Sequence, residues 1–126
     1  MAESVVTVKA KEKMLKARAG VQPLPKIVGM AFGNGGVTEE GAVIPPSGEQ
    51  IALKNELLRK EVDGYTEVSN TCYRYTCTLQ EAELANQHIS EVALYDADGD
   101  LVAIKNCLAK GKDSDTVMIF EIDDIF

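Results

Sequence analysis

A chain of 126 residues, 45% hydrophobic and 26% charged, can bury one core but not two comfortable ones, so residues 1–126 are expected to form a single domain. The formal net charge of −7 argues against a nucleic-acid partner, because phosphate contacts need clustered Lys and Arg. No apolar run suits a secretory signal or a membrane span, so we expect synthesis in the cytoplasm and no membrane partner.

Basic residues concentrate near the N-terminus. Residues 1–26 hold six of the 13 Lys and Arg against two acidic residues, a local charge of +4 beside −11 for the rest of the chain. This asymmetry could guide a basic arm onto an acidic neighbour in an assembly. The alternative interpretation is a solvated helix face.

Strong helix formers fill residues 7–19, and Gly20 suits a helix C-terminus, so we predict an N-terminal helix within residues 1–20. The two prolines of residues 21–25 cannot continue a helix and predict a stiff linker. Residues 26–126 are expected to form an α+β body.

That body opens with a predicted strand over residues 26–33, followed by an Asn34-Gly35-Gly36 turn that we expect to need positive φ. After a loop to about Pro46, residues 47–50 (Ser-Gly-Glu-Gln) have the spacing of a capping box and predict the start of a second helix. Its apolar residues spread over a wide arc, so we expect this helix to cover a sheet with its charged face outward.

Period-two alternation between Tyr65 and Leu79 is the clearest strand signal. Two more strands, residues 89–95 and 101–106, join through residues 96–100, which contain the hairpin dipeptide Asp-Gly, and residues 116–122 supply a last strand. The predicted fold class is therefore α+β, a mostly antiparallel β-sheet with two helices in a single domain.

Three carboxylates at alternate positions, Asp96, Asp98 and Asp100, could surround a calcium ion. An EF-hand loop that begins at Asp96 would need glycine and glutamate where this chain has Leu101 and Cys107. A plain hairpin turn is the favoured interpretation, and a small metal- or ligand-binding module is the alternative function.

No catalytic motif stands out. The one histidine, His88, has no nucleophile motif around it. Cys72, Cys77 and Cys107 are odd in number and lack metal-ligand spacing, so we expect buried reduced thiols. The prediction is no enzyme, no cofactor and no metal.

Three segments carry a resemblance to the N-terminal domain of phage tail-collar fibre proteins. They read KIVGMAFGNGG (26–36), ALKNELLRK (52–60) and ISEVALYDADGDLVA (89–103). That family has an A-x-G-x-G-like strand and turn, a T-x-L-x-N-E-x-x-R helix and an E-x-G-L-F-D-A-D-G-x-L-x-A hairpin, the most specific of the three. The chain departs from it at Ala93 for glycine, Tyr95 for phenylalanine and Leu58 for an aromatic residue. The resemblance extends from the first helix to the last strand.

The resemblance implies a non-enzymatic structural protein of a phage or prophage tail. In such fibres this domain is a proximal anchor that joins a fibre to the baseplate. The implied partners are the chain itself, as a homotrimer, and baseplate proteins, and the implied location is the virion tail. A stand-alone adaptor, a truncated fibre and a prophage remnant all stay open, and receptor binding is not carried over. The residues expected to hold the fold or a subunit contact are Asn55, Glu56 and Arg59 on the second helix, and Asp96, Asp98 and Gly99 in the turn.

Overall fold

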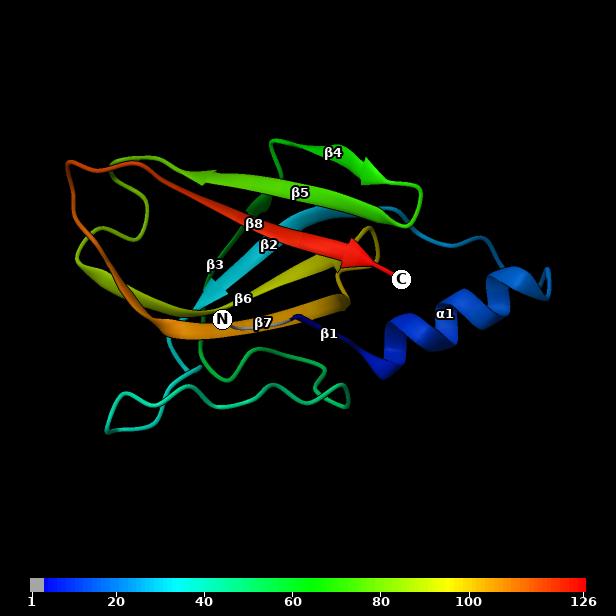
Figure 1. Cartoon of the computed structure of the whole chain (residues 1–126), viewed down its shortest axis with the longest axis horizontal. Coiled ribbons are helices and arrows are strands. Elements are labelled where there is room, and N and C mark those ends of the chain that lie inside the picture. Colours follow the sequence, from blue (N-terminus) through cyan, green and yellow to red (C-terminus); the bar gives the residue numbers. More distant parts are fainter. Residues whose placement is uncertain (1–3) are drawn as a thin grey trace.

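Eight strands and one helix make up the ordered elements of this protein, whose computed structural model describes residues 4–126. The strands pack as two sheets, with the helix projecting at one end (Figure 1). In chain order the elements are β1 (Ser4–Val6), α1 (Val8–Arg18), β2 (Ile27–Gly33), β3 (Glu56–Glu61), β4 (Gly64–Ser69), β5 (Cys72–Leu79), β6 (Gln87–Asp96), β7 (Leu101–Lys112) and β8 (Met118–Ile125).

One sheet has five strands in the order β1-β7-β6-β2-β3, and the other has three in the order β4-β5-β8. All pairings between these strands are antiparallel. The main core lies between the sheets, where Phe32 meets Phe120 edge-on with ring centroids 5.1 Å apart. A smaller core lies on the outer face of the five-stranded sheet and includes Leu53 from the loop between β2 and β3.

The prediction of an α+β fold with two helices is wrong: the described residues form one α-helix and an otherwise antiparallel β structure. The capping-box residues do bond to each other, since Ser47 N donates to Gln50 Oε1 (2.8 Å) and Glu49 N donates to Ser47 Oγ (3.2 Å). No helix follows them, and the charged segment from Glu56 becomes β3.

Tertiary pairing explains why β3 is a strand. Its residues complete the hydrogen bonding of β2, with Arg59 opposite Ala31 and Leu58 opposite Phe32. Alternation then places Leu58 against the main core and Arg59 on the outer face, so both side chains find partners that a helix would not offer. The loop before β3, rather than a helix, covers the outer face of the sheet (Figure 1).

The predicted N-terminal helix is confirmed as α1. Thr7 caps it, with its hydroxyl accepting from Ala10 N (3.1 Å) and donating to Leu101 O (2.7 Å). The helix ends where Gly20 takes a positive φ of 76°. Residues 4–6 form β1 instead of helix, and residues 1–3 of the expected range lie outside the described part.

The predicted strands at residues 26–33 and the hairpin around Asp-Gly are confirmed as β2 and β6–β7. The alternating region from Tyr65 to Leu79 divides into β4 and β5, which pair through a tight turn, with Tyr65 opposite Tyr75. The last strand is β8, three residues longer at its C-terminal end than the predicted range.

Glycines after β2 are required by close packing and not by positive φ, so the expected positive-φ turn at Asn34-Gly35-Gly36 is wrong. Gly36 N donates to Ser90 Oγ (2.9 Å) on β6. A Cβ atom on Gly36 would stand 2.1 Å from the Ser90 carbonyl oxygen, far inside van der Waals contact.

Replacing Gly36 with alanine therefore forces the loop away from β6, and we expect a loss of about 2 kcal/mol or more in the free energy of unfolding. Gly64→Ala is the matched control, because a Cβ there meets no atom within 4 Å. Urea denaturation of both variants checks this. Equal stabilities would contradict the close-packing explanation.

Candidate functional site

The six predicted site residues lie along the outer face and turn end of the five-stranded sheet. Arg59 bonds to two of the others: its Nη1 donates to the Gly99 carbonyl (2.8 Å), and its Nε donates to Glu56 Oε2 (2.8 Å). The guanidinium group also lies over the Tyr95 ring, 4.8 Å from the centroid. Glu56 and Arg59 thus meet the β6–β7 turn from a strand, not from the predicted helix.

Asn55 lies just before β3 and joins the two ends of the covering loop. Its side-chain amide donates to Asn34 Oδ1, and Asn34 N donates to the Asn55 carbonyl (3.2 Å). These bonds fix the spacing between the loop's first and last residues.

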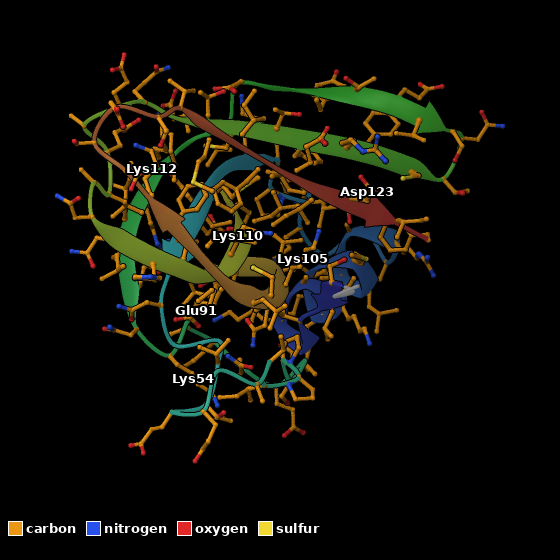
Figure 2. The ribbon with its side chains drawn as sticks, turned by 60° about the vertical axis from the view of Figure 1, so that its left-hand side comes forward. Lys54, Glu91, Lys105, Lys110, Lys112 and Asp123 are labelled. Carbon is orange, nitrogen blue, oxygen red and sulfur yellow. The ribbon has the colours of Figure 1, made fainter. Side chains whose placement is uncertain are left out.

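Glu91 on β6 is not among the predicted site residues, yet it organises this face. Its carboxylate is fully buried, with Oε2 accepting from Gly35 N and Asn55 N (2.8 Å each) and Oε1 accepting from Lys54 N (2.9 Å). Figure 2 shows Glu91 on the sheet above the loop that carries Lys54. A charged residue inside the apolar run of β6 is the sequence signal for such a role.

Lys13 gathers the carboxylates of the β6–β7 turn. Its buried ammonium group donates to Asp96 Oδ2 (2.7 Å), Asp98 Oδ2 (3.1 Å) and Asp100 Oδ2 (2.7 Å). Asp96 is buried as well, and its Oδ1 accepts from the backbone amides of Asp98 (3.0 Å) and Asp100 (3.1 Å). We call these four residues the lysine cluster: Lys13, Asp96, Asp98 and Asp100. The cluster holds α1 against the turn.

Opposing effects act on the charges of the lysine cluster. Burial lowers the pKa of Lys13, but the hydrogen bonds that Lys13 donates to Asp100, Asp96 and Asp98 outweigh burial and raise the pKa above its ordinary value. The hydrogen bond from Lys13 in turn lowers the pKa of Asp100. Both partners are therefore charged at neutral pH.

The three carboxylates offer ligand atoms within 4.8 Å of one another, as the calcium hypothesis requires. The Lys13 ammonium group, however, hydrogen-bonds to all three of them. The chain itself thus supplies a cation for these carboxylates, and a calcium ion would have to displace Lys13.

The histidine and the thiols do not form a nucleophile–base pair among the described residues. His88 is exposed at the start of β6, opposite Gly111. Cys77 is buried, and burial raises the pKa of its thiol to about 11, so the reactive thiolate is scarce at neutral pH. All three cysteines are free; Cys72 is buried like Cys77, but the prediction of burial is wrong for Cys107, which is half-buried.

An open groove of about 790 Å³ lies between β7 and β8, and Val43 of the covering loop also lines it. Its lining is mainly apolar, with Leu108 and Ile119 exposed, and it carries Lys105 and Lys110 on β7 (Figure 2). None of the helices in residues 4–126 combines the length and apolarity that crossing a bilayer requires.

Because Lys13 compensates a buried carboxylate, replacing it with methionine leaves the Asp96 charge without its cation. We expect Lys13→Met to lower the free energy of unfolding by about 3–5 kcal/mol. Lys11→Met, on the exposed side of the same helix, is the control and should change it by less than about 0.5 kcal/mol. Equal denaturation midpoints for the two variants would show that the lysine cluster does not hold the helix.

Two further carboxylates bond to cations on the three-stranded sheet side. Asp123 accepts from Arg74 Nε (2.8 Å) and Nη2 (3.2 Å), and this pairing lowers the pKa of Asp123. Glu83 accepts from Lys60 Nζ (2.6 Å), which lowers the pKa of Glu83.

These lowered pKa values predict acid sensitivity. In the folded state the pKa values of Asp100, Asp123 and Glu83 are lower than their ordinary values of 3.8, 3.8 and 4.5. The stability that these carboxylates add is therefore fully present above the ordinary pKa values, and it is lost as the pH falls through the lowered folded-state pKa values. Burial raises the pKa of Asp124, which acts in the opposite direction but alone. Denaturation from about pH 6 to about pH 2 should show falling stability, with a smaller decrease in Asp123→Asn. A flat profile would contradict this.

The sequence of this chain matches one protein family. The model of the family described as phage tail-collar fibre protein, N-terminal, matches residues 1–119. No curated protein matches the chain. No solved structure matches it either. Because the match includes the helix, the covering loop, the Arg59 strand and the Asp-Gly hairpin, the chain belongs to the phage tail-collar fibre family.

Proposed function

We propose that this domain is a non-enzymatic anchor at the proximal end of a tail fibre, attached to the tail baseplate. Family membership makes the chain a component of the phage tail. The proposal goes further, to the place of the domain along the fibre and to its mechanical role. We also propose a homotrimer with baseplate proteins as its other partners, synthesised in the host cytoplasm.

The observation that carries the proposal is the use of charged residues inside the domain. Glu91 holds the covering loop, Arg59 holds β3 to the β6–β7 turn, and Lys13 holds α1 to the same turn. None of these contacts leaves a charged group facing a substrate-sized cavity. Charged contacts of this kind, between elements of one domain, stabilise the shape that a fibre anchor must keep under mechanical load.

The sequence separation of the residues that these charged contacts join supports a load-bearing role as well. They join elements that are far apart in sequence: Asp96 comes 83 positions after Lys13, and Glu91 comes 56 positions after Gly35. Antiparallel pairing already connects neighbouring strands through backbone hydrogen bonds. The charged contacts add connections from α1, the covering loop and β3 to β6 and the β6–β7 turn that backbone pairing between neighbouring strands does not make.

The test uses tail particles assembled in cells that carry the gene. Particles purified by sedimentation should contain peptides of this chain in fixed proportion to sheath and tube proteins, and electron microscopy of particles tagged in this domain should place the tag at the baseplate. Particles that form fully without this chain, or a tag at the distal fibre tip, would contradict the proposal. Gly64→Ala serves as a control variant that should enter particles like the natural chain.

A further inference from the structure

The last four residues of α1 and the segment after it project from the body as an arm, defined here as residues 15–24. An 11-residue helix is marginal alone and depends on packing. Ala10 and Lys13 supply that packing, but beyond Met14 all residues of the arm are exposed except Ala17. Figure 1 shows α1 running away from both sheets toward one end of the long axis.

The arm carries exposed apolar side chains that the body does not cover. Leu15 is 63% exposed, Val21 68% and Leu24 53%. The segment is ordered by its own backbone, since Val21 N donates to the Lys16 carbonyl (2.9 Å) and closes the helix end. Exposed leucine and valine on an ordered projection indicate a surface that packs against a partner.

The charge of the arm has one sign. It contains Lys16 and Arg18 and no acidic residue, and neither forms an ion pair within the described residues 4–126. Basic residues in a last helical turn favour the helix dipole by themselves. The helix dipole does not account for the apolar residues beside them.

The complementary surface is the covering loop, residues 34–55, which has three glutamates and one basic residue, Lys54. Glu39 and Glu40 stand exposed on a tight turn, fixed by hydrogen bonds from Thr38 N to Ala42 O (2.8 Å) and from Gly41 N to Thr38 O (2.9 Å). Ile51, 79% exposed, adds apolar surface to this acidic loop.

Within one chain, the arm does not reach the acidic loop. The loop touches the first residue of α1, where Val8 N donates to the Gly48 carbonyl (2.7 Å), and the helix then leads away from it. In Figure 1 the arm lies at the right, and the turn near residue 40 lies at the lower left. The two surfaces can therefore meet only between copies.

We propose that the arm of one copy docks onto the acidic loop of a second copy. The contact is heterologous, so repeated copies close into a ring when the rotation between them permits. The groove between β7 and β8 is disfavoured as the docking place, because Lys105 and Lys110 on its wall have the same charge as the arm. The inference deepens the proposed fibre role, since it names the second copy as the partner of this domain.

Charge reversal tests the contact in purified protein. The natural chain should self-associate in sedimentation equilibrium at up to about 200 µM and dissociate as NaCl rises from about 50 mM to about 500 mM. The arm variant Lys16→Glu with Arg18→Glu, and the loop variant Glu39→Lys with Glu40→Lys, should each weaken association by about 10-fold or more. In an equimolar mixture of these two variants, each contact between unlike chains pairs opposite charges, so association should recover, as it should in the chain that carries all four substitutions.

Lys105→Glu with Lys110→Glu is the matched control, with the same charge change on the groove wall, and should associate like the natural chain. Circular dichroism confirms that each variant is folded. A natural chain that stays monomeric, unaltered association in the arm variant, or no recovery in the fourfold variant would overturn the inference. Incorporation into tail particles is measured separately, so failure of the arm contact is distinguishable from failure of the anchoring role.

Discussion

The buried carboxylate of Glu91 is the interaction on which the rest of this domain depends. It stands in the middle of β6, the strand between β2 and β7, and accepts three backbone hydrogen bonds from the covering loop. A buried charge is costly unless hydrogen-bonded, and buried amides are costly unless paired, so each stabilises the other. The loop can therefore cover the outer face of the sheet without any secondary structure of its own, and Leu53 fills the small core beneath it.

The charged groups of the β6–β7 turn extend this scheme to the helix and the edge strand. The lysine cluster fixes α1 to the turn, and Arg59 fixes β3 to the Gly99 carbonyl. The carboxylates that resemble a ligand site in the sequence therefore bond to a partner from within the chain, Lys13. Acidic side chains close together need a cation, and here a lysine provides it.

The charged contacts within the domain differ in role from its exposed apolar surfaces. The apolar core joins the two sheets, and the charged contacts join the loop, α1 and β3 to the five-stranded sheet. The apolar residues Leu15, Val21, Leu24 and Ile51, on the arm and the acidic loop, stay exposed within the described residues 4–126. The anchor role proposed above would use both properties: a stable subunit, and complementary surfaces that meet only between copies.

The sequence by itself determined the elements whose signals are local: α1 between Thr7 and Gly20, the strand β2, and the β6–β7 hairpin at Asp98-Gly99. Its family motifs also determined membership, because they depend on residue order alone. Only the tertiary structure decided that Glu56–Glu61 is a strand, since the unpaired edge of β2 offers hydrogen bonds that outweigh a modest helix propensity. It alone placed Lys13 among carboxylates 83 residues away and Glu91 beneath a loop 56 residues away, because contacts at such separations leave no periodic trace in the sequence.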